Sequence, residues 1–438
     1  MGRQLYGVVF MLATLLAGCG ARQDDNEIVV QRFFGTCRAE YGQRTDVENA
    51  NGECGIITTL INQFAKAHPE LRIRVSPVAW PGYNQLSAQL AAGDPPDVLV
   101  MHMSAISDYQ SRGLLEPLDE GLKAVGVDPA GFTAVSRKGV TKEGAIYGLP
   151  FDTWAQLWHI NLNYFRKAGL VDQNDEPILP TSPDELLAQA RRFKQATGKP
   201  YFVQSLVNER GSYVRNLYTL LMQQNSAFFA DPKHLVLQTP EARNVLQLMK
   251  TISAERLTTL NQDYAAATNG FMSGDGGVYL VGTWLIGDFD AESKKPGRPL
   301  SNGYTVRPYP KLFARDTTYT DGHAWVVPTK KRTETQRRAI YSLLKFLADN
   351  DYQWARTGHL PAYTAVIESE VFKSLPHRAS IAQLGTLGSS LPPGVQRQFP
   401  IQDMLSEEVA AAIAGQKPID QALADAEGRI NDLLFHLL

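Results

Sequence analysis

The chain has 438 residues, of which 44% are hydrophobic and 20% are charged, and its 43 basic and 45 acidic side chains leave a net charge of −2. A nucleic-acid-binding protein normally carries a basic excess, and a disordered chain is poor in apolar residues, so the composition argues against both. At about 100 to 200 residues per domain, the length predicts two or three lobes, with room for a cleft between them.

The N-terminus has the features of a lipoprotein export signal. Arg3 precedes an apolar run from Leu5 to Leu16, and the sequence Leu16-Ala17-Gly18-Cys19 follows. Small residues suit signal-peptidase cleavage, and the Cys19 thiol accepts a diacylglyceryl group. We predict a signal peptide over 1–18 and a lipid-anchored linker over 19–27, on a protein exported to the periplasm or cell surface. The alternative, a membrane-spanning anchor, needs a longer apolar run of about 20 residues.

Two cysteines remain once Cys19 is acylated. Cys37 and Cys54 are then the only available pair, and an exported compartment is oxidising, so we predict a disulfide between them. In the chain-entropy model such a loop stabilises the fold by roughly 3 kcal/mol. A metal site is disfavoured because no nearby His or Cys completes a tetrahedral set.

The region after the leader alternates between strand and helix patterns. Apolar residues between Gly55 and Pro69 recur with helical spacing, and Val98–Met101 is wholly apolar, as in a strand buried on both faces. The predicted order is a strand at 28–30, a helix at 55–69, a strand at 71–76, a short helix around Leu86 and Leu90, and a strand at 98–101. This order is typical of a doubly wound parallel sheet.

The second half of the chain is richer in helix signals. Ser182 to Glu185 form a capping box with Pro183 at the first helical position, and Gly198 ends that helix. Thr333 and Gln336 are expected to cap a later one. Further helices are predicted at 213–224, 240–253, 407–414 and 418–437, and strands at 277–281, 304–308 and 324–327.

Six short stretches carry a family resemblance. They are Ala91–Val98 (AAGDPPDV), Gly113–Leu118 (GLLEPL), Tyr147–Pro150 (YGLP), Leu157–Asn161 (LWHIN), Gly282–Trp284 (GTW) and Thr357–Ala362 (TGHLPA). In this order, behind a lipoprotein signal, they make the chain resemble the solute-binding proteins of bacterial ABC sugar importers, of the maltose-binding type.

The resemblance implies an α/β, two-lobed periplasmic-binding-protein fold of type II, with a ligand cleft between the lobes. We expect an N-lobe of 26–152 plus 323–365 and a C-lobe of 153–322 plus 366–438. Ligand would close the hinge between them, and permease subunits with a cytoplasmic ATPase would recognise the closed form. We expect a monomer that needs no cofactor or metal and binds no nucleic acid.

A sugar has apolar C–H faces and a rim of hydroxyls, so its site needs flat aromatic rings beside carboxylates, amides or Arg. Four of the six tryptophans lie in or beside the family-like stretches, namely Trp80, Trp154, Trp284 and Trp325. Trp284 is the first candidate because similar proteins present a stacking Trp after this strand; the alternative is a core Trp at a helix start. Trp325 is carried by a predicted strand.

Polar candidates lie beside these aromatic residues and at strand ends, where doubly wound folds bind ligands. They are Asp152, Thr153, Tyr83, His102, Ser104, Asn208, Glu209, Arg210, Asp321, Gly322, His323, Arg356 and His359. The alternatives are a solvated turn for Asp152 and a structural role for His102. The turn after Met101 departs from the maltose-binding pattern, which implies a different sugar orientation or specificity. Asp97 is expected to cap the start of a strand.

The resemblance favours a non-catalytic receptor for a mono- or disaccharide, such as the α-linked disaccharides trehalose and maltose. One alternative is a lipid-anchored glycoside hydrolase, for which Asp152, Glu209 and Asp321 offer carboxylates; a retaining pair sits about 5–5.5 Å apart. Another is a receptor for a non-sugar solute. Calcium is disfavoured, because Pro177 stands where the Asp172–Glu176 segment would need Gly.

Overall fold

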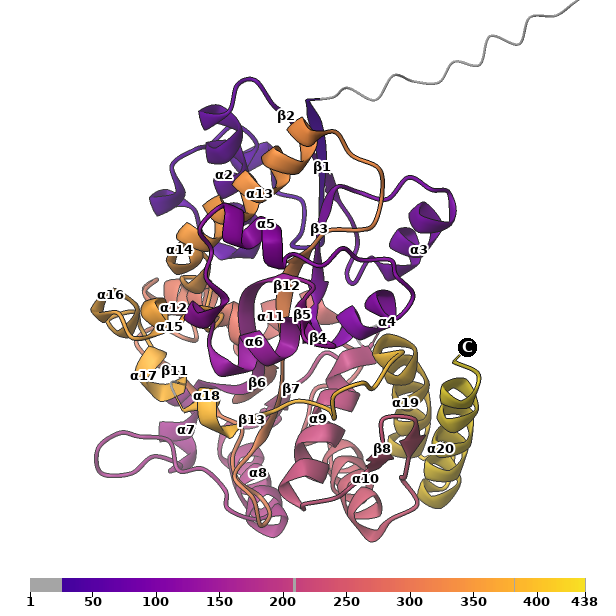
Figure 1. Cartoon of the computed structure of the whole chain (residues 1–438). Coiled ribbons are helices and arrows are strands. Elements are labelled where there is room, and N and C mark those ends of the chain that lie inside the picture. Colours follow the sequence, from indigo (N-terminus) through magenta and orange to yellow (C-terminus); the bar gives the residue numbers. More distant parts are fainter. Residues whose placement is uncertain (1–25, 208–209, 382, 438) are drawn as a thin grey trace, which may run out of the picture.

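Two long strands pass from one lobe to the other and join most of the sheet into one surface (Figure 1). They are β6 (Leu149–Asn161) and β12 (Thr318–Val326), every residue of which is buried. The computed structural model describes residues 26–207, 210–381 and 383–437. The predicted signal peptide, Cys19, Asn208 and Glu209 lie outside these residues. No helix within the described part of the chain is long and apolar enough to cross a bilayer.

The sheet follows the order β2-β1-β3-β12-β6-β10-β7, with β11 paired to β6 and β13 to β12. Strands β1 (Glu27–Arg32), β2 (Arg72–Pro77) and β3 (Val98–His102) are parallel. Strand β12 then runs antiparallel to both β3 and β6. The remaining strands are β7 (Phe202–Val203), β10 (Val278–Gly282), β11 (Tyr304–Pro308) and β13 (Gly388–Ser389). The sheet is therefore mixed: the three N-terminal strands are parallel as predicted, β7 is parallel to β10 and β13 to β12, and the other pairs are antiparallel.

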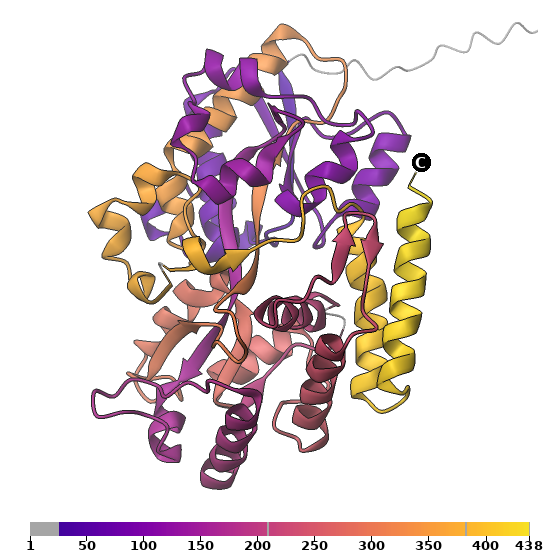
Figure 2. The same ribbon diagram turned by 60° about the horizontal axis from the view of Figure 1, so that its bottom comes forward.

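The helix signals were confirmed with small shifts, except that the helix predicted at 407–414 begins nine residues earlier, at Gln398. The predicted helices correspond to α2 (Gly52–Ala67), α3 (Tyr83–Ala91), α8 (Pro183–Thr197), α9 (Arg210–Gln223), α10 (Pro240–Ala254), α13 (Glu334–Asp349), α19 (Gln398–Ile413) and α20 (Ile419–Phe435). Helices α19 and α20 lie side by side along α9 and α10, as both views show (Figures 1 and 2). Glu27 already belongs to β1, so the predicted linker 19–27 extends one residue too far.

Helix caps show which local signals acted as expected. Thr333 and Gln336 form the full capping box of α13. At α8, Ser182 accepts from the Glu185 backbone N–H, but the Glu185 carboxylate accepts from the Thr181 backbone and hydroxyl instead of Ser182. The predicted reciprocal box is therefore wrong in its second half, because Thr181 offers that carboxylate two donors.

The buried hydrophobic residues form separate cores, and the boundary between them lies where β6 and β12 pass from one lobe to the other. Leu149 and Phe151 pack into a core with β1, β3 and α2, and Ala324–Val326 belong to the same core. Trp154 and Trp158 pack with α8, α9 and α10 instead. A third cluster contains Ala155 and Leu157, which alternate along β6 with Trp154 and Trp158, and it includes Ala355 and Leu360. The lobe limits proposed from the sequence remain a prediction. Ala355 and Leu360 were expected in the N-lobe, but they pack with residues of the expected C-lobe, such as Leu157 and Tyr279.

Asp97 anchors the N-terminal lobe. Its carboxylate is fully buried, accepts from the Val29 backbone N–H at 2.8 Å, and pairs with Lys330 at 2.8 Å and Arg332 at 3.3 Å. The expected role at the start of a strand is thus observed, with two cations added from a segment far along the chain.

We predict that Asp97→Ala lowers the free energy of unfolding by about 3–5 kcal/mol, because it removes the buried carboxylate that pairs with Lys330 and with the Arg332 guanidinium. Arg332 keeps its second partner, Glu116. Chemical denaturation measures this loss. The matched control is the exposed neighbour Asp94, whose replacement by Ala should change stability by less than about 0.5 kcal/mol. Equal effects at the two positions would contradict the structural role of Asp97.

Candidate functional site

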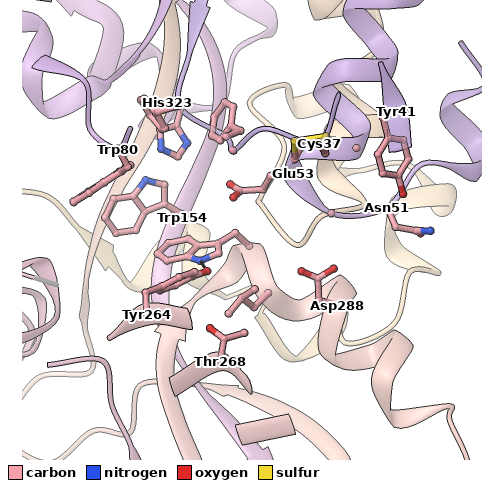
Figure 3. A pocket seen from close by; sticks show the side chains of 18 of the residues that line it. Cys37, Tyr41, Asn51, Glu53, Trp80, Trp154, Tyr264, Thr268, Asp288 and His323 are labelled. Carbon is pink, nitrogen blue, oxygen red and sulfur yellow. Dashed lines mark hydrogen bonds between the residues drawn. A yellow bond between two sulfur atoms is a disulfide. The ribbon is translucent and has the colours of Figure 1, made fainter. Parts of the chain in front are cut away.

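A cavity of about 700 Å³ lies between the lobes and is lined from both sides (Figure 3). Phe33 and Phe34, which follow β1, and Glu53, on α2, come from the N-terminal lobe. Tyr264 and Thr268, on α11 (Tyr264–Met272), come from the C-terminal lobe. The complete lining is Phe33, Phe34, Gly35, Cys37, Glu40, Tyr41, Asn51, Gly52, Glu53, Cys54, Gly55, Trp80, His102, Trp154, Arg215, Tyr264, Thr268, Trp284, Leu285, Asp288 and His323.

Three of the predicted tryptophans meet in this cavity. Trp80 follows β2 and is 40% exposed, and Trp284, in the 3-10 turn Thr283–Leu285, is partly exposed. Trp154, on β6, is only 2% exposed and makes an edge contact with Trp284 at 5.7 Å between ring centroids. Trp80 and Trp284 therefore present indole surface to the cavity, whereas Trp154 mainly supports them. Trp325 is fully buried in the N-terminal core.

Arg215 lies among these three rings. Its guanidinium carbon is 4.8 Å from the ring centroid of Trp154, 5.7 Å from that of Trp284 and 5.8 Å from that of Trp80. Such contacts are attractive because the ring face is negative. The side chain is 8% exposed, and no described residue bonds to its guanidinium through a hydrogen bond or ion pair. This places a donor at the cavity wall with hydrogen-bonding capacity to spare.

The disulfide loop forms another wall. Cys37 and Cys54 are bonded, with 6.0 Å between their Cα atoms, which confirms the predicted pair. The loop contributes Glu40, Tyr41 and Asn51 to the lining. Arg356 fixes it from the outside by donating to the carbonyls of Val47, Glu48 and Ala50. The bridge therefore shapes the cavity in addition to stabilising the chain.

A buried ion pair lies directly behind the lining residue His323. The Asp152 carboxylate accepts from the His323 backbone N–H at 3.1 Å, lies 2.8 Å from His323 Nδ1, and accepts from Trp354 Nε1 at 2.7 Å. Burial alone would raise the pKa of Asp152, but His323, His359 and these hydrogen bonds lower it to about 2. Burial likewise opposes protonation of His323, yet Asp152 raises its pKa overall. Asp152 lies within β6 and is fully buried, so the solvated-turn alternative is wrong.

The ligand atoms of Asp152, His323 and His359 lie within 4.8 Å of one another, a spacing that also suits a metal ion. Both Asp152 oxygens, however, already accept hydrogen bonds from His323 or Trp354. His359 Nε2 is 2.8 Å from the lining carboxylate Glu53. We therefore assign these side chains to an internal hydrogen-bond network behind the cavity wall.

Several sequence candidates hold other residues in place. Tyr83 Oη accepts from the His102 backbone N–H and lies 2.9 Å from His102 Nδ1. Burial, with His323 and Arg215 nearby, holds the pKa of His102 well below its ordinary value, so the ring that faces the cavity is neutral. Ser104 donates to Asp321 through both its backbone N–H and its hydroxyl.

The remaining candidates belong to the strand crossing or to α9. Thr153 exchanges backbone hydrogen bonds with Leu360. Gly322 allows close approach of the strands, since a Cβ there would lie 2.3 Å from the Asp152 carbonyl oxygen. Arg210 begins α9. Asp321, Gly322 and His323 lie inside β12, so the expectation that they precede the strand is wrong.

Sequence reasoning missed the acidic part of the site. Glu53 projects from the first turn of α2, and Asp288 from α12 (Ile286–Ser293). Burial, and then the charge of Glu53, raises the pKa of Asp288 to about 6. Asp288 lies four residues beyond Trp284, and that proximity to the best aromatic candidate was the only available signal. Arg215, inside a mostly apolar helix pattern, had none.

Comparisons with known proteins agree on one family. Residues 59–380 match the model of the bacterial extracellular solute-binding proteins. A binding protein of Brucella abortus is 23% identical over 384 residues, covering 85% of this chain and 88% of its own length. The lactose-binding protein of Rhizobium radiobacter is 21% identical, covering 63% of this chain and 64% of its own. The maltose-bound MalE3 structure of T. maritima superposes with a TM-score of 0.76 at 19% identity, covering 93% and 99% of the two chains.

The raised pKa of Asp288 predicts that the stability of the folded protein depends on pH. Below about pH 4 the group is protonated both folded and unfolded; as the pH rises towards 6, only the unfolded chain releases the proton, so the native protein loses stability. Asp288→Asn removes this loss. Two pKa units correspond to about 3 kcal/mol, which solvent screening in the cavity reduces to about 1–2 kcal/mol.

Denaturant titrations of the ligand-free protein between pH 4 and 8 would therefore show Asp288→Asn gaining on the wild type up to pH 6 and holding that gain above it. The control is Asp290→Asn on the same helix. Asp290 pairs with Lys294 at 2.6 Å, so this variant should gain no stability. A gain at Asp290, or none at Asp288, would contradict the assignment.

Proposed function

Because this chain belongs to the family of bacterial extracellular solute-binding proteins, we propose that it is the non-catalytic sugar receptor of an ABC importer. The observation that carries the proposal is the group of three tryptophans around Arg215, in a cavity shared by both lobes. Its volume of about 700 Å³ is in the usual range of small-ligand sites.

The proposed contacts follow from sugar chemistry. The partly exposed faces of Trp80 and Trp284 would take the C–H faces of one or two sugar rings. Arg215 would donate to ring or hydroxyl oxygens, and its contact with Trp154 holds it in position. Glu53 and Asp288 would accept from hydroxyls. His102, on β3, and His323, on β12, would complete the polar rim.

We infer an α-linked disaccharide such as trehalose or maltose as the neutral ligand to test first. The maltose in the T. maritima structure and the name of the R. radiobacter relative support the sugar class. Ligand binding would draw the lobes together by bending β6 and β12 near Asp152, and the closed form would deliver the sugar to the permease. A lipid anchor at Cys19 would keep the receptor at the membrane surface.

The hydrolase alternative loses support from the positions of its carboxylates. Asp152 and Asp321 are not among the residues that line the cavity, and both are occupied by hydrogen bonds inside the strand crossing. Incubation of the protein with disaccharides, followed by assay for released monosaccharide, tests the remaining carboxylates. Sustained turnover would contradict the receptor proposal.

A thermal-shift panel of sugars, peptides and metal ions tests the ligand class, since a ligand that binds only the folded state raises the melting temperature. We expect a shift with at least one oligosaccharide. A shift with peptides and none with any sugar would overturn the proposal.

We predict that Trp284→Ala weakens sugar binding by about 30-fold or more, which corresponds to about 2 kcal/mol, because stacking area and water exclusion are lost together. Trp284→Phe keeps a ring and should retain much of the affinity. Isothermal titration calorimetry measures both. The control is the core residue Trp325, whose replacement by Phe should lower the melting temperature and leave the dissociation constant unchanged. Wild-type affinity in Trp284→Ala would refute the stacking role.

A further inference from the structure

The cavity carries more negative charge than a neutral sugar requires. Three carboxylates line it, from Glu40, Glu53 and Asp288, and Arg215 is the only Lys or Arg in the lining that the structure describes. His323 adds no free positive charge, because it is paired with the buried Asp152. The lining is therefore acidic even with Arg215 protonated.

Arg215 does not neutralise the acidic side. Its guanidinium is held against the three indoles, and the described residues include no ion pair between it and a carboxylate. In Figure 3 the carboxylates of Glu53 and Asp288 project into the cavity beyond Trp154 and Tyr264. The cavity therefore holds one guanidinium packed against indoles and, apart from it, the carboxylates of Glu53 and Asp288.

Asp288 has hydrogen-bonding capacity to spare. It forms no hydrogen bond or ion pair with any residue that the structure describes, whereas Glu53 uses one oxygen, Oε1, for His359 Nε2 at 2.8 Å. Burial, and then the charge of Glu53, opposes ionisation of Asp288 and raises its pKa. A bound cation between them would remove that repulsion.

The surroundings suit an ammonium group better than a metal ion. Calcium takes 6–8 oxygen ligands, whereas the described lining of the cavity offers the three carboxylates of Glu40, Glu53 and Asp288. An ammonium group instead donates three hydrogen bonds. The hydroxyls of Tyr264 and Thr268 line the same cavity (Figure 3), and the Tyr264 hydroxyl, which accepts from Trp284 Nε1 at 2.9 Å, can accept a second hydrogen bond. The rings of Tyr264 and Trp284 add faces that attract cations.

We propose that the ligand is an amino sugar: an oligosaccharide whose protonated amine binds between Glu53 and Asp288 while its rings stack on Trp284 and Trp80. This inference rests on the proposed function of sugar binding and names the class of sugar. The amine forms no covalent bond with the protein. Its charge compensates the two carboxylates, and a hydroxyl in its place would leave their repulsion in force.

Calorimetry on pairs of sugars that differ at one amine tests the proposal. The pairs are aminodeoxytrehalose with trehalose, and the chitosan disaccharide with its N-acetylated form. At pH 6.5 and low salt we expect the amine of at least one pair to bind tenfold or more tightly than its partner. Added salt should weaken this preference, because the interaction is electrostatic.

Variants test whether Glu53 and Asp288 cause the preference for the amine. Asp288→Asn and Glu53→Gln should each reduce the ratio of amine to neutral affinity by about tenfold. Asp290→Asn, which removes an acid from the same helix outside the cavity lining, should leave the ratio unchanged. Because Asp288→Asn is expected to fold more stably than the wild type, loss of binding in that variant is not a folding defect.

The outcomes separate this inference from the proposed function. If neutral sugars bind as tightly as every amino sugar tested, the inference is overturned and the sugar receptor stands. If no sugar of either kind binds, the proposed function fails and the inference fails with it. If EDTA abolishes the preference, or Asp290→Asn reduces it as much as Asp288→Asn does, the paired carboxylates do not hold the amine and the inference is overturned.

Discussion

The Asp152 carboxylate holds together the strands that pass between the lobes. It accepts from the His323 backbone, lies against the His323 ring, and accepts from the Trp354 indole, so it joins β6, β12 and α14 (Asp351–Ala355) at one buried point. The register of β6 on β12 shifts at this point, between His323 and Ala324. A charge that is buried and fully paired is costly to unpair, so this pairing keeps His323 at the cavity wall while the strands continue into both lobes.

Around this point the protein combines a rigid support with a lining rich in unused hydrogen-bonding groups. Ser104 donates to Asp321, Tyr83 accepts from the His102 backbone and Thr153 exchanges backbone hydrogen bonds with Leu360. None of the side chains of Ser104, Asp321, Tyr83 and Thr153 lines the cavity. Trp80, Trp284, Arg215 and Asp288 do line it. A binding site needs such open groups, and we expect the burial that raises the pKa of Asp288 to lower the stability of the folded chain above pH 4.

The disulfide connects stability with binding. The loop between Cys37 and Cys54 is polar, and its helix α1 (Arg38–Tyr41) is a single short turn. The bridge, the Arg356 hydrogen bonds and the burial of Tyr41, Val47 and Ala50 in the N-terminal core together order the segment that presents Glu40 and Asn51 to the cavity. The first turn of α2, which carries Glu53, begins within the same loop. The position of Glu53 at the cavity wall therefore depends on the disulfide, which the local sequence predicts only as a stabilising bond.

Local sequence determined the helices, the buried N-terminal strands, the caps at Ser182 and Thr333, and the disulfide, because each depends on residues close in sequence or on a choice among very few cysteines. Through the family resemblance it also gave Trp80, Trp154 and Trp284 as candidates, and the structure brings all three to one cavity. Tertiary structure alone decided that Asp152 supports the wall instead of facing ligand, that β12 runs antiparallel through the middle of the sheet, and that Arg215, Glu53 and Asp288 share a cavity. These facts depend on which side of a strand or helix meets another element from a distant part of the chain, and neither periodicity nor capping records that choice.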